Sequence, residues 1–237
     1  MTSNPAGSNN PASGSTTPER AYLSWSSGKD AAFSLFEARR LGLAVIVGLL
    51  TSVNEVAERV AMHGVRRRLL ELQAEAAGLP LLEVPLPYPC TNDIYEARMR
   101  AASTKIRDEG VERMVFGDLF LEDVRAYREE RLAAAGMQGI FPLWGRKTDA
   151  LAREMIDAGL VAYLATVDPR RLDRRFAGRR FDAALLAELP GDVDPCGENG
   201  EFHTVVTAGP MFSHPIDVEV GEIVERDGFV YADIIPV

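Results

Sequence analysis

Short apolar runs alternate with amphipathic stretches through the first two-thirds of the chain. "AVIVGLL" at 44–50 has the continuous, β-branched character of a buried parallel strand. Helical spacing appears at 65–77, where the apolar residues share one face and Gly78 ends the segment. The same signals predict strands at 21–25, 44–50, 79–86, 113–119, 139–144 and 160–167, and helices at 28–41, 65–77, 92–108, 122–135 and 148–158. This alternation favours an α/β fold, a doubly wound parallel sheet with helices on both faces.

The last third of the chain changes character. A short helix at 181–189 leads into the polar loop "PGDVDPCGENGEFHT", and Asp227-Gly228 suits a turn between two strands near the end. We therefore expect an α/β domain at 19–136 and a smaller β-containing C-terminal domain at 137–237. Residues 1–18 contain mostly Ser, Asn, Pro, Gly and Thr, so they have little to bury and are expected to form a disordered tail.

Charge and cysteine usage restrict the class of protein. The formal net charge of −9 argues against a nucleic-acid partner, because neutralising phosphates takes a surplus of Lys and Arg. The longest apolar run, at 41–50, is far below the roughly 20 residues that span a bilayer, so no membrane partner is expected. Cys90 and Cys196 form no CxxC pair. A reducing, cytoplasmic location is the simplest interpretation.

The loop "SSGKDA" at 26–31 connects the first predicted strand to the first predicted helix. It lacks the first glycine and the final hydroxyl of a Walker-type P-loop, and Gly28 alone does not make a dinucleotide fingerprint. Backbone N–H groups of residues 26–28, at a helix N-terminus, nevertheless suit an anion. Lys29 adds a positive charge, and Asp30 offers a carboxylate for Mg²⁺. The alternative is a structural glycine turn without a ligand.

These six residues resemble the PP-loop, Ser-Gly-Gly-Lys-Asp-Ser, of N-type ATP pyrophosphatases. Ser27 stands in place of a glycine and Ala31 in place of the final serine; Ser27 is tolerable if its backbone avoids positive φ. Further stretches at 62–81, 117–172 and 196–204 ("CGENGEFHT") are similar to the diphthine–ammonia ligase family. The resemblance covers about residues 21–214.

This resemblance implies a Rossmann-like nucleotide domain followed by a substrate-recognition domain. It also implies an ATP-dependent ligase in which a carboxylate attacks the α-phosphate of ATP, and ammonia then displaces AMP from the acyl-adenylate. ATP and Mg²⁺ are the implied cofactors. The implied partners are ammonia and a carboxylate acceptor, for which a protein is one carrier. The sequence also allows a homodimer.

On the nucleotide side, Gly117-Asp118 ends a predicted strand, where open α/β sheets place ligand groups. An Asp that caps the following helix is the alternative. His63, just before a helix, is a further candidate, although an ordinary helix-entry residue explains it as well. The expected cofactor-binding residues are Ser24, Ser26, Ser27, Gly28, Lys29, Asp30, Thr51, His63, Gly117 and Asp118, with Asp30 also the expected metal ligand.

On the acceptor side, residues 196–204 are expected to face the loop across a cleft between the domains. Glu198 and Glu201 suit the capture of an ammonium ion and the removal of its proton. The expected catalytic residues are Lys29, Asp30, Glu198, Glu201 and His203. The expected acceptor contacts are Arg125, Arg128, Trp144, Cys196, Gly197, Asn199 and Thr204.

Two other functions remain open at this point. A PP-loop enzyme that modifies tRNA is one, although thiolases usually need paired cysteines. An ATP-binding regulatory module without turnover is the other, because Ser27 and Ala31 both depart from the PP-loop pattern.

Overall fold

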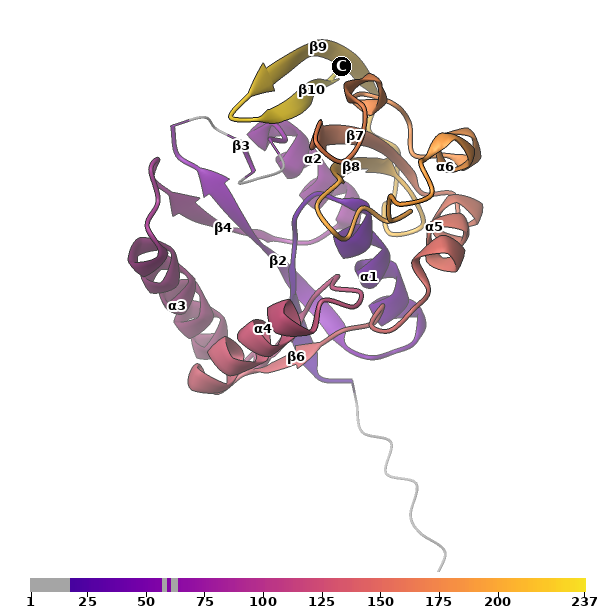
Figure 1. Ribbon diagram of the computed structural model, residues 1–237. Helices are drawn as coiled ribbons and strands as arrows, with labels where there is room; N and C mark the ends of the chain where they lie inside the picture. Colours follow the sequence, from indigo (N-terminus) through magenta and orange to yellow (C-terminus); the bar gives the residue numbers. More distant parts are fainter. Residues whose placement is uncertain (1–17, 57–58, 61–63) are drawn as a thin grey trace, which may run out of the picture.

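The computed structural model describes residues 18–56, 59–60 and 64–237 (Figure 1). The tail expected at 1–18 therefore lies outside the described residues, apart from Pro18.

A parallel sheet, sheet A, forms the first half of the protein. Its strands lie in the order β4-β2-β1-β5-β6, and the two-residue β3 pairs antiparallel with the end of β2. The bounds are β1 (Arg20–Ser24), β2 (Val45–Asn54), β3 (Arg59–Val60), β4 (Leu81–Leu86), β5 (Arg113–Val115) and β6 (Gln138–Ile140). The strand order reverses on either side of β1, which is the Rossmann-like arrangement that places ligands at the carboxyl end of β1.

Helices cover both faces of sheet A, and the alternation of side chains along β1 shows which helices lie on which face. Ala21 and Leu23 belong to the core that includes α1 and α2, whereas Tyr22 belongs to the core that includes α3 and α4. The helices are α1 (Lys29–Arg40), α2 (Arg67–Ala77), α3 (Asn92–Asp108) and α4 (Glu122–Ala134). The doubly wound arrangement expected from the sequence is confirmed.

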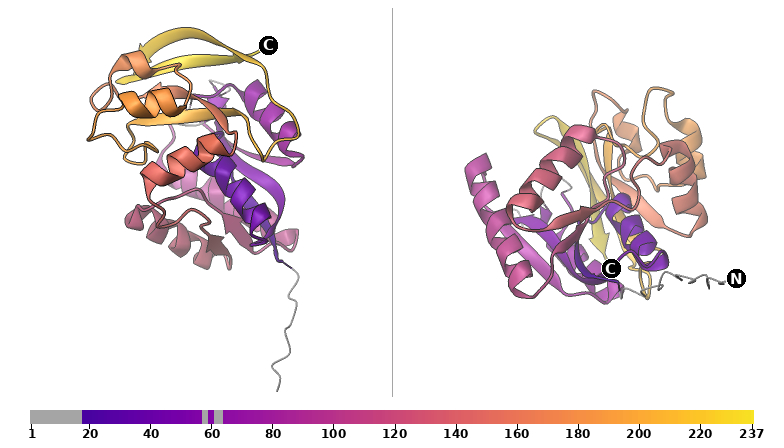
Figure 2. Two further views of the ribbon diagram at one scale, coloured as in Figure 1. Left: turned by 90° about the vertical axis from the view of Figure 1, so that its right-hand side faces the viewer. Right: turned by 90° about the horizontal axis from the view of Figure 1, so that it is seen from below.

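The C-terminal region contains a second, antiparallel sheet, sheet B, in the order β8-β7-β10-β9 (Figures 1 and 2). Its strands are β7 (Val161–Val167), β8 (Phe202–Ala208), β9 (Val218–Arg226) and β10 (Phe229–Pro236). The helices of this region are α5 (Thr148–Asp157), a 3-10 turn (Arg174–Phe176) and α6 (Ala183–Glu188).

Three strand predictions need correction. The run at 160–167 was expected to continue the parallel sheet, but it forms β7 of sheet B. A mostly buried apolar strand has the same composition in either kind of sheet, so its pattern does not reveal its neighbours. The strands expected at 113–119 and 139–144 are shorter, because the chain leaves the ladder after Val115 and Ile140 to build loops at the sheet edge. The shortened β6 still pairs with β5 in sheet A.

One hydrophobic core joins the two sheets. A single cluster contains Leu23 of β1, Phe33 of α1, Leu164 of β7, Val205 of β8 and Ile234 of β10. Sheet B therefore packs against helices α1 and α2, which cover this face of sheet A. Among the described residues, no helix has the length and apolar character needed to cross a membrane.

Candidate functional site

The loop between β1 and α1 is held in place by sheet B. The Ser27 carbonyl accepts hydrogen bonds from the backbone N–H of Val206 at 2.9 Å and from Nε2 of Gln73 at 3.1 Å. One residue on, the Lys29 backbone N–H donates to Oγ1 of Thr204 at 3.0 Å. The loop and β8 are thus in direct contact at Thr204 and Val206, whereas residues 196–204 were expected to face the loop across a cleft.

Ser27 departs from the sequence-based expectation, because its φ is 71°. A left-handed conformation costs a non-glycine residue about 1–2 kcal/mol, and the family motif has glycine at this position. The two hydrogen bonds to the Ser27 carbonyl hold this strained conformation in place. The Ser27 hydroxyl is buried and has no hydrogen-bond partner among the described residues.

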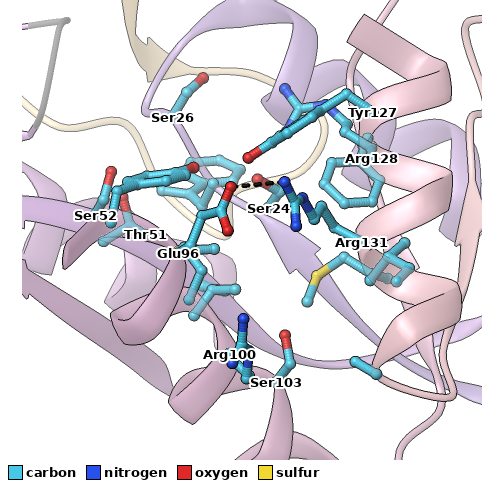
Figure 3. A pocket seen from close by; sticks show the side chains of 18 of the residues that line it. Ser24, Ser26, Thr51, Ser52, Glu96, Arg100, Ser103, Tyr127, Arg128 and Arg131 are labelled. Atoms are coloured by element: carbon cyan, nitrogen blue, oxygen red, sulfur yellow. Dashed lines mark hydrogen bonds and ion pairs between the residues drawn. The ribbon is translucent and has the colours of Figure 1, made fainter. Parts of the chain in front are cut away.

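Two neighbouring cavities lie beside the loop. The larger of the two, of about 330 Å³, lies between α3 and α4 at the carboxyl edge of sheet A (Figure 3). Its walls are mostly apolar and aromatic, with Trp25, Tyr95 and Phe116 among them, and Ser24 and Ser26 add hydroxyl groups to the lining. Such walls with a few polar groups suit a small organic ligand. An ion pair of 2.6 Å between Glu96 on α3 and Arg131 on α4 crosses this cavity (Figure 3).

The smaller cavity, of about 240 Å³, is more polar and lies where the loop, the end of β5 and residues 196–204 meet. Gly28, Lys29 and Asp30 line it from the loop side. Ser24, Ser26, Phe116 and Arg128 line both cavities. The two cavities therefore share a wall beside the loop.

Lys29 is 2% exposed and lies at the base of the smaller cavity. Its Nζ is 2.8 Å from a carboxylate oxygen of Asp30 and donates to the backbone carbonyl of Cys196. Burial lowers the pKa of Lys29, but the Asp30 carboxylate, together with Cys196 and Glu198, offsets this and holds the pKa above its ordinary value. Lys29 therefore carries a positive charge at neutral pH.

Gly117 and Asp118, which follow β5, both lie at this cavity. A Cβ at Gly117 would stand 2.8 Å from the backbone carbon of Asp30, so only glycine allows the loop after β5 to approach α1 this closely. Asp118 forms an ion pair of 2.8 Å with Arg128. The alternative role of Asp118 as a helix cap does not apply, because Leu121 occupies the N-cap position of α4. The Arg128 guanidinium lies over the ring of Phe116, 4.7 Å from its centroid.

Burial perturbs three titratable groups from residues 196–204. It raises the pKa of Glu198 to about 7, although the carboxylate accepts a hydrogen bond of 3.0 Å from the Leu119 backbone N–H. Burial lowers the pKa of His203 to about 4, so this imidazole is neutral at pH 7. Burial also raises the pKa of Cys196 to about 12, which argues against a thiolate nucleophile. Glu198 is the carboxylate of this segment that is poised to exchange a proton near neutral pH.

Glu201 and Asn199 do not take the places expected of them. The Glu201 carboxylate is 2% exposed and accepts hydrogen bonds from the backbone N–H groups of Asp194 and Asn199 and from the Asn199 side chain. Neither residue lines either cavity. Their side chains instead fix the shape of the loop.

Arg125 and Trp144 also lie away from the two cavities. The Arg125 guanidinium stacks over Phe141 and Trp144, with 4.7 Å and 4.6 Å to the two ring centroids. Arg125 also pairs with Glu129 at 2.8 Å, one turn along α4. His63 lies outside the described residues. The remaining expected residues, apart from Ser27, line one or both cavities: Ser24, Ser26, Gly28, Lys29, Asp30, Thr51, Gly117, Asp118, Arg128, Cys196, Gly197, Glu198, His203 and Thr204.

Gln73 of α2 and the aromatic wall of the larger cavity are parts of the site that the sequence reasoning missed. Gln73 is fully buried against the loop and β8. Its position offered a signal, because a polar residue falls on the helix face that carries Leu69 and Leu70. Buried polar side chains are hydrogen-bonded, so this position predicts a specific partner.

Comparison with known proteins agrees with this arrangement. Residues 19–138 match the diphthamide synthase N-terminal domain, and residues 147–234 match the diphthamide synthase C-terminal domain. The chain belongs to the diphthamide synthase family. The first matched segment contains the whole of sheet A up to the start of β6, and the second contains sheet B and helices α5 and α6.

Curated relatives in this family carry the name diphthine–ammonia ligase. Those of Bos taurus and Homo sapiens are 25% and 26% identical over 230 residues, which is 88% of this chain and 86% of each relative. The relative from Schizosaccharomyces pombe is 25% identical over 222 residues, which is 85% of this chain and 36% of that protein.

Proposed function

We propose that this protein is an ATP-dependent ligase that adenylates a carboxylate and then amidates it with ammonia. The wall shared by the two cavities carries the proposal. It lies beside the N-terminus of α1, where backbone N–H groups and the helix dipole favour phosphate. A nucleoside in the larger, aromatic-lined cavity would direct its phosphates past this wall into the smaller, polar one.

Residues around the wall suit the charge of a triphosphate. Lys29 is a buried ammonium that is charged at neutral pH, and Arg128 lines both cavities. An acceptor carboxylate in the smaller cavity would attack the α-phosphate and release pyrophosphate, and these two cations would stabilise the charge that leaves.

Glu198 and His203 suit the amidation step. The ammonium ion must lose a proton to become ammonia, the nucleophile, and a carboxylate with a pKa near 7 can take that proton at neutral pH. The neutral His203 imidazole is available to orient the acceptor. The walls from both halves of the chain shield an acyl-adenylate from water, which would otherwise hydrolyse it.

Asp30 fits the role of a Mg²⁺ ligand. Among the described residues, no group of three or more His, Cys, Asp or Glu side chains is placed to hold a metal ion. Mg²⁺ at phosphate sites usually takes only one or two carboxylates and completes its shell with water and substrate phosphates. Asp30 lines the smaller cavity beside the loop, where Mg²⁺ would neutralise phosphate charge.

The products of the reaction test the proposal. With ATP, ammonium and an acceptor carboxylate, we expect AMP and pyrophosphate in equal amounts with the amide. The name of the relatives makes diphthine the first acceptor to try. Hydroxylamine in place of ammonium should trap the acyl-adenylate as a hydroxamate. Chromatography of the nucleotides and mass spectrometry of the acceptor make both measurements.

Three control reactions accompany this experiment: one lacks ATP, one lacks ammonium and one lacks the acceptor. Accumulation of ADP would contradict the proposed chemistry. Tight ATP binding without turnover, under any acceptor tested, would instead support a regulatory nucleotide-binding module.

A further inference from the structure

Gln73 makes three hydrogen bonds that connect the two halves of the site. Its Oε1 accepts from the Trp25 indole N–H at 3.0 Å, and its Nε2 donates to the carbonyls of Ser27 at 3.1 Å and Val206 at 2.7 Å. Both N–H donors of the amide are thus used. Gln73 is 0% exposed, so no ligand in either cavity reaches it.

The bond to the Ser27 carbonyl determines where the next N–H group points. The C=O of Ser27 and the N–H of Gly28 belong to one planar trans peptide, so they point in opposite directions. Gln73 and Val206 hold the carbonyl on the buried side. The Gly28 N–H is thereby directed to the other side, where Gly28 lines the smaller cavity. Within the described part of the chain, this N–H makes only a long contact of 3.4 Å with the Ser26 hydroxyl.

The Ser27–Gly28 peptide can turn over unless its carbonyl is held. Such a rotation changes ψ of Ser27 and φ of Gly28, and a glycine, which has no Cβ, adopts the resulting conformation at little steric cost. If the carbonyl lost its partners, the rotation would turn its oxygen toward the phosphates. An oxygen lone pair would then replace a hydrogen-bond donor in the anion site.

We infer that Gln73 is a positioning residue that keeps the Ser27–Gly28 peptide in the orientation that binds phosphate. This inference rests on the proposed ATP-binding function. It assigns Gln73 no contact with the substrate. Gln73 acts on the phosphate site by holding the backbone of the loop at Ser27. Its second bond, to the Val206 carbonyl, connects the same side chain to β8 on the acceptor side.

The Gln73→Glu variant tests this role, because it keeps an oxygen for Trp25 and removes the amide donors. We expect the Kd for ATP to rise about ten-fold or more, the scale of one hydrogen bond to a charged group. The Kd for adenosine, which has no phosphate, should stay unchanged. Calorimetry with both ligands makes the comparison, and the thermal midpoint of each variant establishes that it is folded.

Ser213→Ala is the matched control. The Ser213 hydroxyl donates at 3.0 Å to the carbonyl of Ala76, which lies on α2 as Gln73 does but does not contact the loop. Neither Kd should therefore change. If Gln73→Glu does not fold, Gln73→Met replaces it with the same expected result. Unchanged ATP affinity in a folded Gln73 variant, or equal loss of ATP and adenosine, would overturn the inference. Failure of the unmodified protein to bind ATP would instead contradict the proposed function.

Discussion

Burial shifts the pKa values of Glu198 and His203, which both line the smaller cavity, in opposite directions. It favours the neutral form of each, so the pKa of Glu198 rises to about 7 and that of His203 falls to about 4. Near neutral pH, Glu198 therefore changes its charge while His203 does not. This difference separates a proton acceptor from a neutral hydrogen-bonding group.

Amidation should become faster as the pH rises through about 7, because Glu198 is a base only after it has lost its proton. Rates are compared per concentration of ammonium ion, because ammonium is the species from which Glu198 takes the proton. In Glu198→Gln we expect this pH dependence to disappear and amidation to fall by about 10²-fold, while ATP affinity is retained. An unaltered pH profile in that variant would exclude Glu198 as the base.

Glu198 and Glu201 show what a sequence leaves undecided at this scale. Both lie in one polar loop, three positions apart, and both were expected to be catalytic. Gly197 and Gly200 adopt positive φ, and each turns the chain just before one of these carboxylates, so Glu198 lines the cavity whereas Glu201 accepts hydrogen bonds within the loop. The residue types predicted the chemistry, but the direction of each side chain depends on turns that residue types do not fix.

At the scale of elements, the approach of the segment after β5 to the start of α1 brings Asp118 beside the loop. Gly117 allows this approach because it has no Cβ, and the atoms opposite belong to the backbone of residues 30 and 31. A backbone has no rotamer with which to move aside. The geometry of the site therefore depends on this contact.

Gly117→Ala should lower the free energy of unfolding by about 1–3 kcal/mol, the usual cost of overpacking a tight contact. Urea unfolding followed by circular dichroism measures the change. Gly191→Ala is the control, because nothing lies within 4 Å of a Cβ added there, and it should be close to neutral. Equal effects of the two substitutions would show that the contact at Gly117 is not tight.

The strands illustrate which elements the sequence predicts well. β1, β2 and β4 were expected within a few residues, since buried parallel strands give long apolar runs. β7 gave the same signal but pairs with β8 and β10 in the antiparallel sheet. Strand pairing depends on contacts with residues far along the chain, which a local pattern does not record.

On the scale of the whole molecule, the two sheets share one core. Leu23 of β1 and Phe33 of α1 belong to the same cluster as Leu164 of β7 and Val205 of β8. Neither half of the chain can keep this surface buried without the other. The two matched family segments are therefore expected to be one cooperative unit.

Unfolding should follow a single transition. The chain has two tryptophans. Trp144 lies against Phe141 and Arg125 of α4, whereas Trp25 lies against Phe212 of the C-terminal region, so fluorescence reports on sheet A and on its contact with the C-terminal region. We expect the fluorescence and far-UV circular dichroism curves in urea to coincide, and the calorimetric and van't Hoff enthalpies to agree. Two separated transitions would show that the sheets are independently stable.

The hydrogen bonds between the loop and β8 also set an order of events at the ribosome. Sheet A is complete when residue 140 has been synthesised, yet Thr204 and Val206, which hold Lys29 and Ser27, emerge more than sixty residues later. A nascent chain with a finished parallel sheet thus still lacks the contacts that shape its phosphate loop. Nucleotide stabilises a protein only by binding its folded form. Under the proposed function, ATP can therefore stabilise the chain only after β8 has emerged, and folding of the N-terminal half must proceed without its help.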